Sequence, residues 1–282
     1  MTKLIMPAER DFGWQLKPIE SAYFQIHQRA NGQFCVVLNH PLIRGVTTEM
    51  LQWWFLNFTR LRVRLRDVEG YQGQSVPGYL LWHPSDHLGA SLSGSLGPDG
   101  TAKAGATIEI QEAMQYLKYG WKYPVNNKLK VFYCGPDGWA MGKQLPALGP
   151  VMMLRIHFKD VADGDEHFGA HYHYEIVIGV SADNTIGRSI NKRITSHFSP
   201  EFFEAWQTHN VIEVGTFENF LPALFEQRDK GVLLDYEKSM NNAQTPAAQR
   251  GHDRELFLDR LRGYTESKDP HRFQAYEAPS FL

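Results

Sequence analysis

A long amphipathic stretch near residue 200 constrains the fold of this 282-residue chain more than any other feature. Ser199, Pro200 and Glu201 predict a helix start, because serine caps a first turn, proline is tolerated at the first helical position and a carboxylate suits the first turn. One apolar stripe follows, made of Phe202, Trp206, Phe217, Phe220, Leu221 and Leu224. Gly215 and Pro222 predict a break or kink. A helix with such a stripe must pack against another layer.

Strand signals earlier in the chain indicate what that layer is. Segments rich in β-branched and aromatic residues occur at 34–38, 79–83, 107–114, 128–133, 151–160 and 169–180, and a further strand is predicted near 190–196. The Asp163-Gly164 pair is typical of an antiparallel hairpin. Antiparallel strands followed by a long amphipathic helix indicate an α+β fold in which a curved sheet closes around the helix and encloses a cavity.

The other segments are assigned more coarsely. Thr47 or Thr48 can cap a helix that runs to about Leu61. Residues 88–105 are rich in Gly, Ser and Ala and predict a long loop, which is either an entrance to the cavity or a passive insertion. Residues 1–30 are an arm, a small helical segment or a contact with a second copy, and 31–282 form the main domain. A short helix is expected at 254–261 within a polar tail.

Bulk properties exclude several classes of protein. The formal net charge of −2 and the pI near 6.6 do not suit a nucleic-acid binder. Cys35 and Cys134 do not form a Cys-x-x-Cys pair, so a reducing compartment is expected. Proline and charge interrupt the first ten residues before a signal-like apolar core develops, and no run is long enough to span a bilayer. These features predict a cytoplasmic protein that binds neither nucleic acid nor membrane.

His209 and Glu213 continue the apolar stripe of the long helix. They are four residues apart, so on a helix their side chains share a face. A carboxylate directed into a core is costly unless it is paired or bound to a cation. Alternatively, a kink near Gly215 would turn Glu213 to solvent and leave His209 as a hydrogen-bonded core histidine. The His-x-x-x-Glu pattern alone does not decide between these alternatives.

A second stretch, residues 79–87, carries an aromatic strand into His83, Pro84, Asp86 and His87. The proline ends the strand and can turn His87 inward, where His83 or Asp86 would orient it. This places a second imidazole beside the predicted cavity.

The predicted strand 107–114 offers the remaining carboxylate. Glu112 shares a face with Ile108 and Ile110, whereas Glu109 points the other way and is the alternative ligand. Two imidazoles and two carboxylates suit Zn²⁺, with Mn²⁺ or Fe²⁺ as less favoured alternatives. A catalytic zinc keeps one position for water or substrate.

Histidines and tyrosines also occur on the two strands of the predicted hairpin. His157 lies on the first, and His171, Tyr172, His173 and Tyr174 alternate along the second. Beside a cavity such residues are acid–base groups or partners of substrate hydroxyls, His157 being the foremost. Otherwise they are ordinary hydrogen-bonded residues of a sheet.

Several of these motifs together resemble the diacetylphloroglucinol hydrolase family, which includes phloretin hydrolases. The resemblance covers most of residues 36–225 in order. It rests on Asn39-His40-Pro41, Gly45-Val46-Thr47, Trp53-Trp54-Phe55, Tyr79-x-x-Trp82-His83-Pro84-x-Asp86-His87, His209-x-x-x-Glu213 and Phe220-Leu221-Pro222. Two departures concern the substrate side: Ala90 stands where the family pattern has an asparagine, and His171-Tyr172-His173-Tyr174 replaces an Arg-Phe-Trp-like strand.

The resemblance implies a START-like helix-grip fold, as in birch-pollen allergen, with an N-terminal segment that can support a homodimer. It implies a zinc-dependent hydrolase that cleaves the carbon–carbon bond between an acyl group and a polyhydroxylated phenolic ring. The zinc ligands would be His87, Glu112, His209 and Glu213. Tyr79 and His157 would be catalytic groups facing the substrate. Tyr172 and Tyr174, which lie on the strand that departs from the family pattern, are predicted to bind the substrate from the clustering of His and Tyr there. The rival hypothesis is a non-catalytic protein that carries small hydrophobic ligands.

Overall fold

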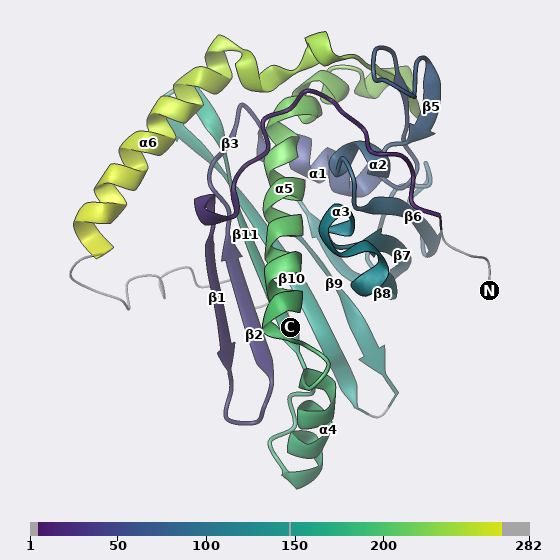
Figure 1. The fold of residues 1–282 in the computed structure, drawn as a ribbon, viewed down its shortest axis with the longest axis vertical. Helices are drawn as coiled ribbons and strands as arrows, with labels where there is room; N and C mark the ends of the chain where they lie inside the picture. The colour runs from purple at the N-terminus through teal and green to yellow at the C-terminus, as the bar shows by residue number, and fades with distance from the viewer. Residues whose placement is uncertain (1–4, 147, 267–282) are drawn as a thin grey trace.

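A large antiparallel sheet dominates the computed structural model, which describes residues 5–146 and 148–266, with side chains to residue 256. Its nine strands are arranged in the order β1-β2-β11-β10-β9-β8-β7-β6, and β3 pairs with β11. The strands are β1 (Tyr23–Gln28), β2 (Phe34–Asn39), β3 (Ile43–Arg44), β6 (His87–Gly94), β7 (Ala106–Ala113), β8 (Pro124–Gly135), β9 (Gly138–Leu145), β10 (Gly149–Asp163) and β11 (Glu166–Ile178). Helix α5 (Pro200–Phe225) lies across one face of this sheet (Figure 1). The predicted α+β helix-grip architecture is confirmed.

Helix α5 begins where the sequence predicts, because the Ser199 hydroxyl accepts a hydrogen bond from the backbone N–H of Phe202 at 3.1 Å. The predicted break at Gly215 and Pro222 is wrong, since the helix is continuous over 26 residues. Pro222 lacks the N–H that would bond to the carbonyl of Glu218. The side-chain amide of Asn242 donates to that carbonyl instead, at 3.5 Å.

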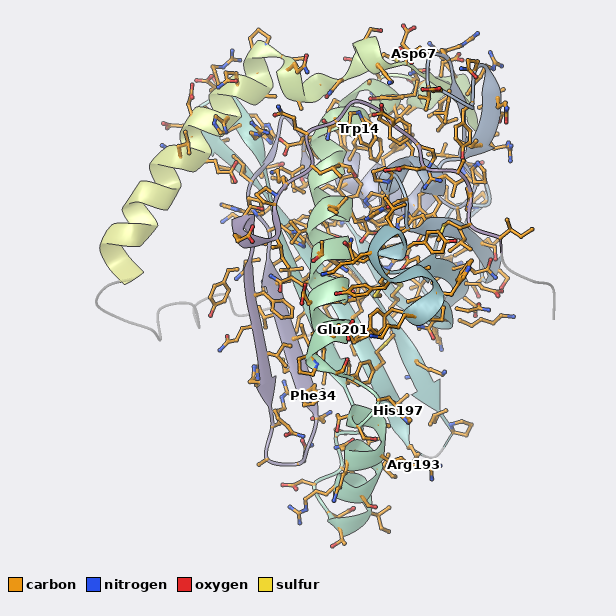
Figure 2. All side chains as sticks on the ribbon, viewed as in Figure 1. Trp14, Phe34, Asp67, Arg193, His197 and Glu201 are labelled. Atoms are coloured by element: carbon orange, nitrogen blue, oxygen red, sulfur yellow. The ribbon has the colours of Figure 1, made fainter. Side chains whose placement is uncertain are left out.

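Gly215 has a packing role rather than a breaking one. A Cβ atom there would lie 3.1 Å from the side chain of Lys17, which crosses the helix at this point. The Lys17 ammonium lies 2.6 Å from the carboxylate of buried Glu218, and Arg44 Nε lies 2.5 Å from the same carboxylate. The N-terminal segment is thereby fixed to the middle of α5. Trp14 packs beside the upper part of α5, with its ring centroid 5.8 Å from that of Phe220 (Figure 2).

Three of the predicted segments have a different structure. Residues 79–83 are not a strand, since Tyr79–Trp82 form the short helix α2. All four side chains are buried, so the sequence has no alternation of apolar and polar residues that would separate a strand from a helix. Residues 190–196 belong to helix α4 (Thr185–Thr195), which Asn184 caps by accepting from the N–H of Gly187 at 2.8 Å. The expected loop 88–105 begins as strand β6, which pairs with β7.

The remaining elements surround this framework. Helix α1 (Thr48–Asn57) has the predicted cap, Thr47, but ends before Leu61. A separate sheet has the order β12-β4-β5, with β4 (Arg62–Leu65), β5 (Gln74–Pro77) and β12 (Leu233–Tyr236). The other helices are α3 (Tyr116–Tyr119), α6 (Pro246–Glu266) and the 3-10 turns Ile19–Ser21, Gly120–Lys122, Arg228–Lys230, Lys238–Met240 and Asn242–Gln244. The segment 1–30, expected as an arm or a small helical piece, includes edge strand β1. Among the described helices none has both the length and the apolar character needed to cross a membrane.

Candidate metal centre

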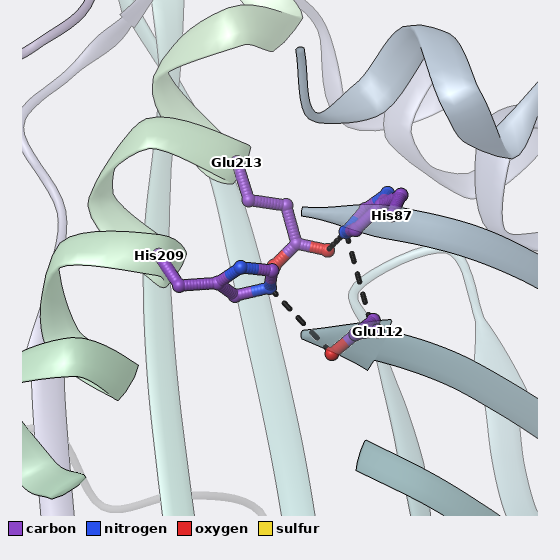
Figure 3. A group of neighbouring side chains, drawn as sticks. All are labelled: His87, Glu112, His209 and Glu213. Carbon is purple, nitrogen blue, oxygen red and sulfur yellow. Dashed lines mark ion pairs between the residues drawn. The ribbon is translucent and has the colours of Figure 1, made fainter. Parts of the chain in front are cut away.

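Four buried side chains from three elements converge between the sheet and α5 (Figure 3). His87 begins β6 and lies opposite Glu112 in the register with β7. His209 and Glu213 project from one face of α5, one turn apart. Because α5 is continuous, the alternative in which Glu213 turns to solvent does not occur; Glu213 is only 9% exposed. The structure thus brings together all four residues that the sequence marks as metal ligands.

The donor atoms are spaced as ligands of one small cation would be. His87 Nε2 lies 3.7 Å from Glu112 Oε1 and 3.5 Å from Glu213 Oε1. His209 Nε2 lies 3.6 Å from Glu112 Oε2 and 4.0 Å from Glu213 Oε2. A tetrahedral zinc with bonds of about 2.1 Å places neighbouring ligand atoms about 3.4 Å apart. The measured separations are close to that value.

Both imidazoles are oriented by hydrogen bonds at their other nitrogen. His87 Nδ1 donates to the backbone carbonyl of Tyr79 at 2.8 Å, and His209 Nδ1 donates to Asp86 Oδ2 at 3.0 Å. The Nε2 atom of each ring therefore faces the two carboxylates. Within the described chain, buried His87 Nε2 has no hydrogen-bond partner, as expected of a nitrogen whose lone pair is kept for a cation. The sequence predicted that His83 or Asp86 would orient His87; the backbone carbonyl of Tyr79 does so, and Asp86 orients His209 instead.

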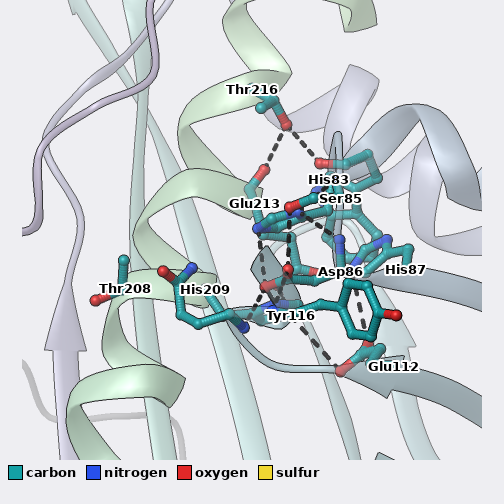
Figure 4. A network of polar contacts seen from close by, with 12 residues as sticks. His83, Ser85, Asp86, His87, Glu112, Tyr116, Thr208, His209, Glu213 and Thr216 are labelled. Carbon is teal, nitrogen blue, oxygen red and sulfur yellow. Dashed lines mark hydrogen bonds and ion pairs between the residues drawn. The ribbon is translucent and has the colours of Figure 1, made fainter. Parts of the chain in front are cut away.

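Asp86 is itself held on several sides (Figure 4). Its carboxylate accepts from the backbone N–H groups of Gln115 at 2.7 Å and Tyr116 at 3.1 Å, and from the Ser85 hydroxyl at 3.0 Å. Gln115 has φ 51°, the only positive φ among the described non-glycine residues, and this conformation points its N–H at Asp86. Burial alone would raise the pKa of Asp86. His83 and the hydrogen bonds from His209 and Gln115 lower this pKa by more than burial raises it, so the carboxyl stays ionised.

The electrostatics of the cluster favour a bound cation. Burial lowers the pKa of His87 to about 3 and raises that of Glu213 to about 7. Burial also lowers the pKa of His209, but the hydrogen bond to Asp86 and the charges of Glu112 and Glu213 raise it more, to about 9. The carboxylates therefore attract positive charge to the cluster. When no cation is bound, a proton on His209 supplies that charge. A divalent cation would compensate the same charges, with both Nε2 atoms as ligands, so the residues fit Zn²⁺.

A cavity of about 470 Å³ opens beside the cluster, between α5 and the inner face of the sheet. Glu112, His209 and Glu213 are in its wall. Most of the remaining lining is apolar or aromatic, including Trp82, Ile110, Trp139, Leu154, Ile176 and Phe203. Its volume lies in the range of small-molecule sites, and a few polar groups gathered at one place are typical of them.

Tyr79 links the cavity to the cluster. Its hydroxyl donates a hydrogen bond to Glu112, and its ring stacks on His87 with centroids 3.9 Å apart and planes inclined by 7°. Burial, together with Glu112 and Glu213, raises the pKa of Tyr79 well above its usual value. The phenol therefore keeps its proton at neutral pH. Tyr79 also lines the cavity.

The structure divides the other predicted site residues between the two faces of the sheet. Tyr172 and Tyr174 line the cavity. His157 does not reach it, because its strand neighbours Ile156 and Phe158 point inward and strand side chains alternate. The His157 ring instead lies 6.2 Å from that of His173 on the opposite face. The sequence predicted His157 as the foremost of the substrate-facing groups, and His157 is not among the residues that line the cavity.

The choice between Glu112 and Glu109 is also decided by alternation. Ile108, Ile110 and Glu112 are buried on one face of β7. Glu109 lies on the other face, 3.4 Å from the ammonium of Lys128 on β8. Of the two carboxylates, Glu112 belongs to the cluster.

Two features of the site were not predicted. Asn210 lines the cavity next to His209, on the same face of α5. The spacing of Trp206, His209, Asn210 and Glu213 places it there, but it was not singled out. The support of Asp86 by Gln115 depends on a left-handed backbone conformation at a non-glycine residue, which no sequence pattern indicates.

No family model and no curated protein sequence matches this chain. Among solved structures, a protein of unknown function from Staphylococcus aureus, SA2116, aligns with a TM-score of 0.32 and 9% identity over 65% of this chain and 97% of its own. Ara h 8.0201 aligns with a TM-score of 0.28 and 12% identity over 66% of this chain and 98% of its own. At these values neither similarity indicates what the chain does.

Proposed function

We propose that the protein is a zinc-dependent hydrolase that cleaves the carbon–carbon bond between an acyl group and a polyhydroxylated phenolic ring, as in phloretin or an acylphloroglucinol. The observation that carries the proposal is the convergence of His87, Glu112, His209 and Glu213 at the wall of an aromatic-lined cavity. The resemblance of the Trp82–His87 and His209–Glu213 motifs to the diacetylphloroglucinol hydrolase family supplies the reaction class.

A zinc ion held by the two Nε2 atoms and the two carboxylates would have to extend its coordination beyond these four ligands to polarise the ketone carbonyl and activate water. The aromatic walls of the cavity take the ring of the substrate and exclude bulk water. Tyr172 and Tyr174 are buried, which raises the pKa of both hydroxyls well above the usual value. They stay protonated and can donate hydrogen bonds to the phenolic oxygens of the ring.

Tyr79 has a different role in this proposal. Its hydroxyl holds the Glu112 carboxylate, and its ring holds the plane of His87, so a single side chain orients two ligands. Tyr79 also lines the cavity, and in this proposal its phenol passes a proton to the ring carbon.

The reaction balances as a hydrolysis. The oxygen of water forms a bond to the carbonyl carbon, and the bond between that carbon and the ring breaks. The electron pair stays on the ring carbon, which takes up a proton, and the ring hydroxyls delocalise the charge during the step. The products are the free phenol and the carboxylic acid.

Product analysis with phloretin and acylphloroglucinols tests this proposal. The zinc-loaded protein is expected to release phloroglucinol-type phenol and the matching carboxylic acid in equal amounts. Chelation should stop the release, and added zinc should restore it. Intact ketone after prolonged incubation with zinc-loaded protein would refute the reaction.

The second candidate function is non-catalytic binding of a small hydrophobic or aromatic ligand. The observation that favours it is the largely apolar lining of the cavity, which needs no chemistry to take up such a ligand. Binding without product formation, equally strong with and without zinc, would favour this function over hydrolysis.

A further inference from the structure

One polar side chain in the cavity wall is left without a partner by the metal cluster and its supports. Asn210 is 4% exposed, and its carbonyl oxygen has no hydrogen-bond partner among the described residues. The backbone of Asn210 is in the middle of α5, so its side chain has no part in capping the helix.

Asn210 is one of the residues that line the cavity. Trp206, His209, Asn210 and Glu213 all line the cavity, and their spacing places them on one face of α5. The amide is therefore next in sequence to one predicted metal ligand and three residues from another. A buried amide oxygen without a partner is unfavourable, so its presence in a site wall points to a ligand group that satisfies it.

Two tyrosine hydroxyls, those of Tyr172 and Tyr174, line the same cavity as Asn210. A phenolic hydroxyl both donates and accepts hydrogen bonds, so Tyr172 and Tyr174 can pair with a hydroxyl of a ligand in either direction. The amide oxygen of Asn210 is an acceptor. The side-chain oxygen of Asn210 needs a donor, which a phenolic hydroxyl of a ligand supplies and a ketone or ether oxygen does not.

We propose that Asn210 is a specificity-determining residue whose side-chain oxygen accepts a hydrogen bond from a ring hydroxyl of the substrate. The inference rests on the proposed phenolic substrate class, and it does not require that the bond between ring and acyl group is cleaved.

Binding measurements with two probes test this inference. The probes are phloretin and its analogue in which hydrogen replaces the hydroxyls of the acyl-bearing ring. Quenching of the cavity tryptophans Trp82, Trp139 and Trp206 reports binding to the full chain, both as purified and with a chelator that stops turnover. The variants are Asn210→Leu, which keeps the size of the side chain, and Asn210→Ala. Asn127→Leu is the matched control, because Asn127 also lines the cavity but is half-exposed on β8.

Both Asn210 variants are expected to bind phloretin at least about tenfold more weakly than the unaltered protein and to bind the analogue equally well. Asn127→Leu should leave the ratio between the two probes within about twofold. Unchanged thermal unfolding and zinc content identify variants that remain folded. Equal loss for both probes, or no loss for either, would overturn the inference, as would failure of the unaltered protein to bind phloretin.

The two proposals can fail separately. Selective loss of phloretin binding in a protein that releases no phenol would refute the hydrolase proposal and support the role of Asn210. If Asn210→Leu changes neither phenol release nor the preference between the two probes, the result would support the hydrolase proposal and refute the role of Asn210.

Discussion

The Nδ1 atom of His209 lies 3.0 Å from Oδ2 of Asp86, although 123 positions separate the two residues in the chain. This bond joins helix α5 to the turn that carries His87. It fixes the tautomer of one predicted ligand, and the same turn supplies the other imidazole. Asp86 is thus a positioning residue for the whole cluster.

Asp86→Asn is expected to weaken zinc binding about 10- to 100-fold. The amide NH₂ group can face His209 Nδ1, which would then meet a donor instead of an acceptor, and the negative charge that orients the ring is lost. Competition with a chelator of known affinity measures the effect. Ser85→Ala, which removes only one of the bonds to Asp86, is the control and should change the affinity little. Unchanged zinc affinity in Asp86→Asn would contradict a positioning role.

Tyr79→Phe separates metal binding from turnover. The ring still stacks on His87, so zinc content should remain, but Glu112 loses its hydrogen bond. A bond to a charged group contributes about 1.5–3 kcal/mol, which corresponds to a roughly 10- to 100-fold lower kcat/KM. Tyr133→Phe, whose hydroxyl bonds to Asp137 outside the cavity, is the control. Full turnover in Tyr79→Phe would rule out this role.

His157→Asn tests the placement of His157 on the far face of the sheet. Zinc content and turnover should both stay within about twofold of the unaltered protein, since neighbours Ile156 and Phe158, not His157, point inward. His209→Asn, the matched change inside the cluster, should lose both. If His157→Asn abolished turnover in a folded, zinc-loaded protein, a catalytic role for His157 would have to be restored.

His40 predicts a pH dependence of stability that is independent of the metal. Burial, with smaller contributions from Lys17 and His173, lowers the pKa of His40 to about 3. Between pH 3 and 6.5 the unfolded chain therefore binds a proton that the folded chain excludes. Stability is lost as pH falls through this range and is constant above it.

The predicted loss from His40 is about 2 kcal/mol between pH 7 and pH 5. Denaturant unfolding of chelator-treated protein at the two pH values measures it. Other groups titrate as well, so the relevant quantity is the difference from His40→Leu, which should lack this part of the loss. An identical pH dependence in the two proteins would contradict a neutral, buried His40.

The sequence predicts the parts of this molecule that depend on local patterns. Ser199 and Thr47 mark the helix starts, and alternation along residues 107–114 places Glu112 with Ile108 and Ile110. His209 and Glu213 were singled out because a carboxylate on an apolar face needs compensation, and the full set of four ligands was implied by the family resemblance.

What the sequence could not give depends on tertiary context. Tyr79–Trp82 is buried on every side, so the periodicity that separates a helix from a strand is absent. Pro222 is tolerated because Asn242, from a different element, donates to the freed carbonyl. Side chains along the strand that carries His157 alternate between the two faces of the sheet. Which of the two faces points inward depends on the position of α5, and the sequence of the strand does not specify it.

Zinc content of the purified protein, measured by elemental analysis beside that of Glu213→Gln, tests the central claim most directly. Glu109→Gln is the matched control, because Glu109 lies on the outer face of β7. The account predicts about one zinc per chain for the unaltered protein and for Glu109→Gln, and a large loss of both zinc and turnover for Glu213→Gln. Full turnover in a metal-free Glu213→Gln protein would contradict it.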